Sequence, residues 1–229
     1  MDKSRILIVD DDPKLLQDVS EALAKEGYEP WKADDGVQAL AMLDSFFFDL
    51  VILDVMMPKL TGFEVCVRIR EHSQVPIIML SAIGDENAKI EILQLGADDY
   101  VVKPFSMQEL IARVQAVMRR VTVREVPNKP TTFTSDGLEV DFNARSVAVD
   151  NENIFLTATE FNLMWELVTH SGEVLTHRVL LHSVWGDEYG EEREYLRVFV
   201  NRLRHKLKDD PTSPRFIKTV PGVGYQFIA

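Results

Sequence analysis

Five polar residues of this chain follow short apolar runs and could do chemistry together. Asp10 and Asp11 follow RILIV, Asp54 ends the run LVILD, Ser81 follows PIIML, and Lys103 follows DYVV. Ligands bind beyond the carboxyl ends of the strands in open parallel sheets, so these side chains should converge. Three converging carboxylates need a cation, and hard oxygen ligands select Mg²⁺ or Mn²⁺. The ammonium and the hydroxyl then fit an anion, namely a phosphoryl group carried by one of the acids.

The elements that would position these residues alternate between strands and helices. Continuous apolar runs recur every 22–25 residues, and segments with helical periodicity lie between them; the runs begin at Arg5, Tyr28, Leu50, Val75 and Asp99. Strands that are apolar along their whole length indicate a parallel sheet covered on both faces. We therefore predict an α/β domain over residues 1–121, with a doubly wound, five-stranded parallel (βα)5 sheet.

A second architecture follows a break in this pattern. Residues 122–131 contain two prolines and no apolar period, which is typical of a linker. Short alternating strands, LEVDF and SVAVD, then precede helical segments near Thr159–His170, Thr176–Val184 and Glu192–Lys208, the first with a capping box at Thr157 and Glu160. The final stretch, FIKTVPGVGYQF, indicates a hairpin with a glycine-rich turn. We predict a winged helix-turn-helix (α+β) domain over residues 132–229.

The net charge of −12 argues against a nucleic-acid partner, because phosphate neutralisation needs a positive surface. The acidic residues, however, are spread over both halves of the chain. Within the last predicted helix, the stretch Arg193–Lys208 carries six basic residues against one acid, Glu194; the basic residues are Arg193, Arg197, Arg202, Arg204, Lys206 and Lys208. A globally acidic protein can therefore still present one basic face.

A helical wheel of the last helix, at 100° per residue, predicts which side chains reach DNA. Leu196, Val200, Leu203 and Leu207 form a core stripe, and Val198 lies opposite it. A valine there could pack on a thymine methyl group, while Arg202 beside it reaches guanine and flanking cations meet phosphates. The predicted DNA contacts are Arg193, Arg197, Val198, Asn201, Arg202, Arg204, His205 and, on the hairpin, Thr219.

The compartment is expected to be the cytoplasm. The start MDKSRILIVDDD has an apolar run too short for a signal peptide or a membrane span, and we expect no membrane partner. Cys66 is the single cysteine, which fits a reducing compartment. We predict that it is a small core residue on a helix rather than a catalytic group.

Several motifs resemble those of a known family. VDDDP, LVILDVMMPKLTGFE, PIIMLSA and GADDYVVKPF are similar to receiver-domain signatures, in the family order. LTATEFNLMWELVTHSGEVLTHRVLLHSVWG, YLRVFVNRLRHKLK and PRFIKTVPGVGYQF resemble OmpR/PhoB-type winged-helix effectors. The resemblance covers nearly the whole chain, and the stretches YLR and DP-x-x-PR are nearer to KdpE-like members.

The resemblance implies a two-component response regulator with a flavodoxin-like receiver, phosphorylated by a sensor histidine kinase, that binds promoter DNA to regulate transcription. It makes Asp54 the phospho-acceptor. Asp11, Asp54 and the Met56 carbonyl would bind the metal, with Asp10 acting mainly through water. Lys103 and Ser81 would contact the phosphoryl group, Tyr100 would rotate inward as the switch, and the bond between Lys103 and Pro104 would be cis.

The resemblance also implies partners. The phosphorylated family members form homodimers, which predicts pairing of Lys89 with Glu109, Asp99 with Arg113 and Asp98 with Arg120 of a second copy. The acidic stretch Trp185–Glu192 could contact RNA polymerase or could be a solvated loop. One departure concerns the hairpin, because Pro221 stands where many relatives have arginine, which argues against a minor-groove contact there.

Two other functions compete with this interpretation. A haloacid-dehalogenase-type phosphatase would also use metal-bound aspartates, but it has a second acid two residues after the nucleophile, where this chain has Met56. That reading also leaves the C-terminal half without a role. A DNA-binding scaffold with a vestigial receiver would not need the intact set of acids, serine and lysine. We expect a regulator that is not an enzyme beyond its own phosphoryl transfer and autodephosphorylation.

Overall fold

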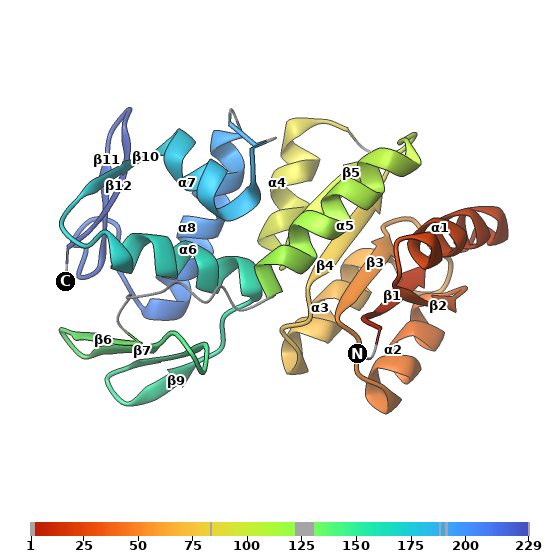
Figure 1. The fold of residues 1–229 in the computed structure, drawn as a ribbon, viewed down its shortest axis with the longest axis horizontal. Helices are drawn as coiled ribbons and strands as arrows, with labels where there is room; N and C mark the ends of the chain where they lie inside the picture. Colours follow the sequence, from red (N-terminus) through yellow and green to blue (C-terminus); the bar gives the residue numbers. More distant parts are fainter. Residues whose placement is uncertain (1–2, 83, 122–130, 188, 191, 229) are drawn as a thin grey trace. The chain divides into compact units, whose positions relative to one another are not determined.

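The computed structural model describes residues 3–82, 84–121, 131–187, 189–190 and 192–228. The chain divides into two compact units, Met1–Arg119 and Arg120–Ala229. Both are drawn in Figure 1. Of the predicted linker, residues 122–130 lie outside the described residues. Within those described residues, no helix is both long and apolar enough to cross a membrane.

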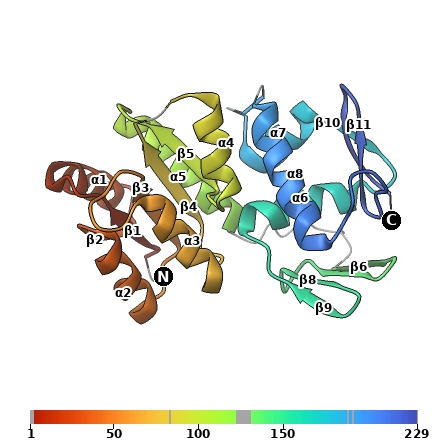
Figure 2. The same cartoon turned by 180° about the vertical axis from the view of Figure 1, so that it is seen from behind.

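The first unit is a five-stranded parallel sheet with helices on both faces, as predicted (Figures 1 and 2). Its strand order is β2-β1-β3-β4-β5, and every neighbouring pair is parallel. The strands are β1 (Arg5–Val9), β2 (Glu29–Ala33), β3 (Leu50–Asp54), β4 (Ile77–Ser81) and β5 (Asp99–Val102). The helices are α1 (Pro13–Lys25), α2 (Gly36–Ser45), α3 (Gly62–His72), α4 (Glu86–Gln94) and α5 (Met107–Val121).

Two apolar clusters, one on each side of the sheet, form the core of this unit. One joins the sheet to α1 and α5 through side chains such as Val19 and Val114, and the other joins it to α2, α3 and α4. Because both faces are covered, β3 and β4 are buried along their whole length. Cys66 belongs to the second cluster, is fully buried and lies with its Sγ 3.7 Å from the Leu95 carbonyl oxygen, which confirms a core position.

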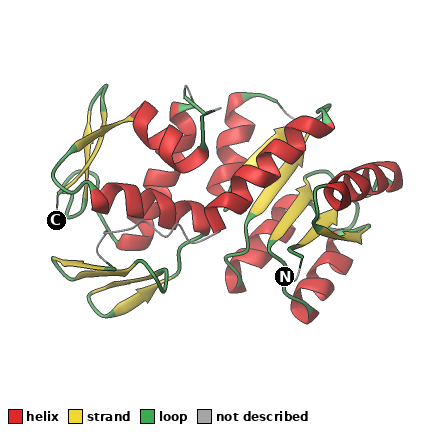
Figure 3. Cartoon of the chain, in the orientation of Figure 1, coloured by secondary structure: helices red, strands yellow, loops and turns green. Residues whose placement is uncertain are grey.

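In its described residues, the second unit contains three helices and two antiparallel sheets, which form separate groups of strands in Figure 3. The helices are α6 (Ala158–Thr169), α7 (His177–Trp185) and α8 (Arg193–Leu207), within one or two residues of the predicted segments. The strands of the first sheet are β6 (Thr132–Ser135), β7 (Leu138–Asp141), β8 (Ser146–Val149) and β9 (Glu152–Ile154). The second sheet consists of β10 (Val174–Thr176), β11 (Ile217–Val220) and β12 (Gly224–Phe227), in the order β10-β12-β11.

Local sequence signals explain the boundaries in this unit. The predicted capping box is present at the start of α6, where Thr157 and Glu160 exchange side-chain and backbone hydrogen bonds. The predicted hairpin is also present, with β11 and β12 joined by a turn at 221–223. Gly224 lies so close to the neighbouring strand that an added Cβ would stand 1.9 Å from the Leu175 carbonyl oxygen. β12, the central strand of this second sheet, therefore requires glycine at its first position.

Candidate functional site

Three carboxylates meet at the carboxyl end of the parallel sheet in the first unit. Asp10 follows β1 and Asp54 ends β3, and these strands are neighbours. Ligand oxygens of Asp10, Asp11 and Asp54 all lie within 4.8 Å of one another. Asp10 and Asp54 are buried, whereas Asp11 is exposed. The cluster therefore combines two buried acids with one that is open to solvent.

The predicted lysine, Lys103, follows the carboxyl end of β5, and its side chain reaches into this cluster. Lys103 Nζ lies 2.7 Å from Asp10 Oδ2 and 2.7 Å from Asp54 Oδ1. The peptide bond that follows it, to Pro104, is cis, as predicted. Ser81 ends β4 with its side chain fully buried, and its carbonyl oxygen accepts a hydrogen bond of 2.7 Å from the Lys103 amide. The structure thus brings the side chains of Asp10, Asp11, Asp54 and Lys103 together, and Ser81 is joined to Lys103 through the backbone.

Burial and charge act in opposite directions on the groups of this site. Burial raises the pKa of Asp54 above its ordinary value, and the neighbouring Lys103 ammonium only partly counteracts this effect. Burial by itself favours the neutral amine of Lys103, but the carboxylates of Asp10 and Asp54 outweigh it and raise the pKa of Lys103. Lys103 therefore stays charged at neutral pH and orients Asp54.

The donor set fits a divalent cation. Formally, one ammonium faces three carboxylates, so the cluster keeps an excess of negative charge. Carboxylate oxygens are hard ligands, which suits Mg²⁺ or Mn²⁺ better than soft metals. The Met56 amide donates a hydrogen bond of 3.0 Å to Asp54 Oδ2, which fixes the loop that begins next to the acid. Asp10, Asp11 and Asp54 are the residues that could hold the ion.

A glycine that the sequence argument did not single out shapes the acceptor position. A Cβ added to Gly62 would stand 2.1 Å from the Asp54 carbonyl oxygen, and the Gly62 amide donates to the Val55 carbonyl oxygen at 2.9 Å. The start of α3 can approach the end of β3 this closely only because Gly62 has no side chain. The motif TGFE contains this glycine, but only the close approach of the two backbones shows its role.

In the second unit, the exposed side of α8 differs from the predicted one. Its exposed residues are Arg193, Arg197, Asn201 and His205. At 100° per residue these positions fall within an arc of about 120°, which defines the exposed face of α8. Thr219 on β11 is also exposed. Four of the eight predicted DNA contacts therefore share one face of the helix, and a fifth lies on the wing.

Comparisons with known proteins match both units to families. Residues 6–115 match the response regulator receiver domain, and residues 151–227 match the C-terminal domain of transcriptional regulatory proteins. A transcriptional regulator named ycf27 from Galdieria sulphuraria is 45% identical to this chain, over 98% of this chain and 90% of that protein. The Thermotoga maritima response regulator DrrB, described as an OmpR/PhoB homolog, matches over 100% of both chains with 32% identity and a TM-score of 0.54. The chain belongs to the OmpR/PhoB family of response regulators.

A second solved structure supports the same architecture for this regulator. A mutant of RitR aligns with 98% of this chain and 98% of its own, with 30% identity and a TM-score of 0.79. The regulator thus consists of a receiver domain and a transcriptional regulatory DNA-binding domain.

The acidic and basic residues predicted for a dimer face are already paired within the regulator. Arg113 Nη1 lies 3.1 Å from Asp99 Oδ1, and Arg113 Nε lies 3.6 Å from Glu109 Oε1. Lys89 Nζ lies over the Tyr100 ring, 5.3 Å from its centroid. These residues come from the edge strand β5 and from α4 and α5, which cover opposite faces of the sheet beside it.

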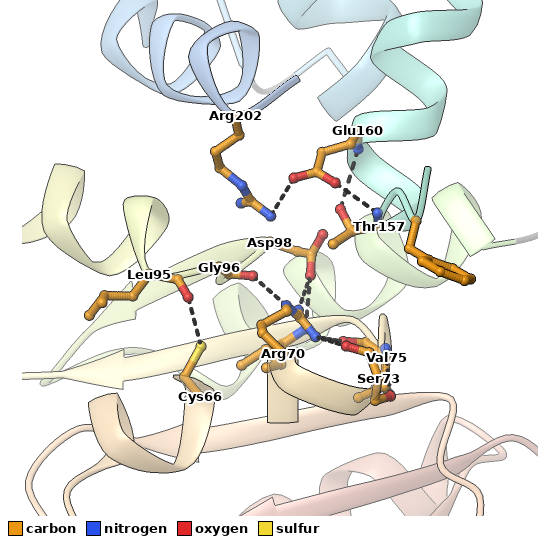
Figure 4. Close-up of polar contacts among 12 residues, drawn as sticks. Cys66, Arg70, Ser73, Val75, Leu95, Gly96, Asp98, Thr157, Glu160 and Arg202 are labelled. Atoms are coloured by element: carbon orange, nitrogen blue, oxygen red, sulfur yellow. Dashed lines mark hydrogen bonds and ion pairs between the residues drawn. The ribbon is translucent and has the colours of Figure 1, made fainter. Parts of the chain in front are cut away.

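Asp98 and Arg120 are not the surface charges that the sequence suggested. Asp98 is fully buried, and its Oδ2 accepts bonds from Arg70 Nη2 at 2.9 Å and the Ile77 amide at 3.1 Å (Figure 4). Arg120, the first residue of the second unit, is 3% exposed and donates to the carbonyl oxygen of Val184 at 3.1 Å. Their predicted pairing across a dimer does not fit these positions, because both side chains are used inside the protein.

Three predicted DNA contacts also lie elsewhere than expected. Val198 is 4% exposed and therefore does not face solvent. Arg202 points toward α6, where its Nη2 lies 2.7 Å from Glu160 Oε1 (Figure 4). Arg204 is 6% exposed and donates to the Ile217 carbonyl oxygen at 2.7 Å and Thr219 Oγ1 at 2.8 Å. Arg202 and Arg204 are thus engaged by partners within the second unit, whereas the sequence placed them toward DNA, and the DNA contact of Val198 stays a prediction.

Proposed function

We propose that the regulator accepts a phosphoryl group on Asp54 from a sensor histidine kinase, and that this modification controls its binding to promoter DNA. The observation that carries the proposal is the convergence of Asp10, Asp11, Asp54 and Lys103 at one sheet edge. A single acid after a strand is usually a turn or a cap. An acid cluster that is partly open to solvent, with a half-buried lysine inside it, is what phosphoryl transfer to a carboxylate requires.

The transfer uses groups already in place. Asp54 Oδ1 faces Lys103 and Oδ2 accepts the Met56 amide, so both oxygens of the nucleophile are oriented. An Asp54 oxygen attacks the donor's phosphorus, the bond to the donor imidazole nitrogen breaks, and the imidazole keeps the electron pair and takes up a proton. Lys103 and Ser81 then hold the phosphoryl oxygens. Mg²⁺, held by Asp10, Asp11, Asp54 and the Met56 carbonyl, would neutralise charge on these oxygens when bound.

Labelling with acetyl phosphate and Mg²⁺ tests this function against its competitors. A regulator should incorporate the label slowly, up to one acid-labile phosphoryl group per chain, and lose it slowly by autodephosphorylation. A chelator should prevent labelling, because the charges of the acids and the incoming phosphoryl group are then uncompensated. Continuous release of phosphate at a high rate would favour a phosphatase, and the absence of any labelling would favour a scaffold.

We further propose that the labelled regulator forms a homodimer through α4, β5 and α5. The proposal rests on Lys89, Asp99, Glu109 and Arg113, which lie on the edge strand β5 and the two helices beside it and carry both signs of charge. Because Asp99 is fully buried and paired with Arg113, dimerisation would have to exchange this intrachain pair for an interchain one, whereas a pair of Lys89 with the exposed Glu109 is of the surface kind, worth about 0–1 kcal/mol. The labelled sample should sediment as a dimer at concentrations where the unlabelled one is monomeric. A labelled sample that remains monomeric would contradict this interface.

For DNA, we propose that the exposed face of α8 enters the major groove. Its polar and basic residues can contact bases and phosphates. The hairpin of β11 and β12, which is the wing, carries the exposed Thr219 beside this helix. The predicted contact of residues 185–192 with RNA polymerase remains a prediction, as does the KdpE-like subgroup. Residues 188 and 191 of that stretch lie outside the described residues.

Arg197→Ala should weaken binding to a DNA site selected by the wild-type protein by on the order of 1–3 kcal/mol. Arg197 is exposed, with Glu194 3.5 Å away as an exposed partner, so its side chain is available to DNA. Lys206→Ala is the matched control, because it removes a cation of the same helix that binds Glu160 and the Phe155 carbonyl oxygen within the domain. Thermal unfolding must first show that the variant is folded at the temperature of the binding assay, since Glu160 is buried. Equal losses of affinity for the two variants, measured by fluorescence anisotropy, would show that the exposed face is not the DNA contact.

A further inference from the structure

A lysine in the loop after the acceptor aspartate contacts a buried carboxylate on another element. We define the acceptor loop as Val55–Thr61, between β3 and α3. Lys59 Nζ in this loop contacts Asp35 Oδ2. The Asp35 side chain is 11% exposed, and its other oxygen accepts a hydrogen bond of 2.8 Å from the Gln38 amide at the start of α2. The phosphoryl-acceptor chemistry described above uses neither residue.

The backbone at Lys59 also suggests that this contact holds the loop. Lys59 has a φ of 69°, in the left-handed region that residues with a side chain rarely adopt. Such a conformation persists where surrounding contacts enforce it, often near functional sites. The Lys59 ammonium lowers the pKa of Asp35 below its ordinary value, so the pair is charged at neutral pH.

The acceptor loop and the start of α2 are packed closely around this ion pair. A Cβ added to Gly36, next to Asp35, would stand 3.0 Å from Leu60 Cβ in the loop. At the other end of the loop, the Met56 amide binds Asp54 Oδ2. Because Met56 lies three residues before Lys59 in the same loop, a shift of Lys59 away from α2 would strain the backbone that presents the Met56 carbonyl, a proposed metal ligand.

We infer that Lys59 is a positioning residue of the phosphoryl-acceptor site: its ion pair with Asp35 holds the acceptor loop against α2 and so places the Met56 carbonyl for a divalent cation. The inference rests on the proposed function of this site. It assigns to Asp35 a second role beyond capping α2. Partners that orient the ligands of a metal commonly change its affinity by about ten- to a hundredfold when they are removed.

The direction in which Mg²⁺ affinity changes when Lys59 is replaced distinguishes this role from a purely electrostatic effect of its charge. Removing a cation near an acidic cluster should strengthen Mg²⁺ binding if Lys59 acts only through its charge. The positioning role predicts the opposite. Lys59→Ala should raise the Mg²⁺ dissociation constant of the unphosphorylated full chain roughly tenfold, as measured by calorimetric titration. Lys59→Arg, which keeps the cation, should bind Mg²⁺ close to the wild-type affinity.

A double-variant cycle identifies the partner. Asp35→Asn keeps an oxygen that can cap α2 but removes the charge, and it should weaken Mg²⁺ binding as much as Lys59→Ala does. Adding Lys59→Ala to Asp35→Asn should then change nothing further, since the two residues act as a pair. Thermal unfolding of each variant checks that the receiver stays folded at the titration temperature.

Unchanged or tighter Mg²⁺ binding by folded Lys59→Ala would overturn the inference, as would additive losses in the double variant. Neither result would affect the assignment of Asp54 as the acceptor, provided that the variants are still labelled there. If the phosphoryl label were found not to be on Asp54, the proposed function would be overturned instead.

Discussion

Asp54→Asn should abolish labelling by acetyl phosphate in the presence of Mg²⁺. The amide of asparagine has no carboxylate oxygen to attack phosphorus, so the covalent step is removed and not merely slowed. The substitution changes shape very little, because the side-chain oxygen can still accept the Met56 amide and Lys103 keeps its contact with Asp10. Incorporation of phosphoryl label per chain is the measurement.

The variant should also remain folded, which makes the loss interpretable. Burial raises the pKa of Asp54 in the folded protein, so its charged form is less favourable there than in the unfolded chain. When the pKa of an acid is higher in the folded than in the unfolded protein, ionising the acid lowers the free energy of unfolding. This loss begins as pH rises above the pKa of the unfolded chain, and it persists at neutral pH. Without Mg²⁺, Asp54→Asn should therefore unfold at a temperature no lower than that of the wild type.

A matched control lies just before the same strand. Asp49 precedes β3 at the opposite edge of the sheet, is exposed, and accepts a hydrogen bond of 2.8 Å from the Arg5 amide. Asp49→Asn makes the same chemical change far from the acid cluster and should leave labelling unaffected. Labelling of Asp54→Asn at full stoichiometry would refute the acceptor assignment.

Glu160→Gln should lower the unfolding free energy of the DNA-binding domain by about 3–5 kcal/mol, the usual cost of removing one partner of a buried ion pair. The Glu160 side chain is fully buried between two cations of α8: Arg202 Nη2 lies 2.7 Å from Oε1, and Lys206 Nζ lies 2.6 Å from Oε2. Glutamine can still accept the Thr157 amide, so the capping interaction survives and only the charge is lost. The two cations would then face a neutral group inside the protein.

The pH dependence of this effect has a definite sign. Burial tends to raise the pKa of Glu160, but Arg202 and Lys206 outweigh it, and the folded-state pKa lies below the ordinary value. Such a group stabilises the fold above its unfolded pKa, and the contribution is lost as pH falls through the folded pKa. The difference between wild type and Glu160→Gln should thus be full at neutral pH and shrink in acid.

An exposed ion pair of the same length provides the control. Lys208 Nζ lies 2.6 Å from Glu152 Oε2, but both side chains are about two-thirds exposed, at 69% and 67%. Glu152→Gln should cost at most about 1 kcal/mol. Denaturant unfolding in a Trp31→Phe background reports on this domain, since the remaining tryptophans are Trp165 and Trp185. Similar losses for the two variants would show that the buried pairing does not stabilise α8.

The sequence by itself determined the receiver site, because chain order and strand period were enough. Each of Asp10, Asp54, Ser81 and Lys103 stands at the end of an apolar run, and parallel strands bring their carboxyl ends to one edge whatever the details of packing. The extents of α6, α7 and α8 were likewise predictable, since capping residues and apolar periodicity are local signals.

Only the tertiary structure decided which charged side chains are available to a partner. Asp98 pairs with Arg70, Arg202 with Glu160, and Lys59 with Asp35, over sequence separations of 28, 42 and 24 residues. A helical wheel assigns one buried stripe to a helix, but α8 also contacts α6 and, through Arg204, β11. Long cationic side chains reach whichever acid or carbonyl the packing of distant elements brings near, and no local pattern encodes that proximity.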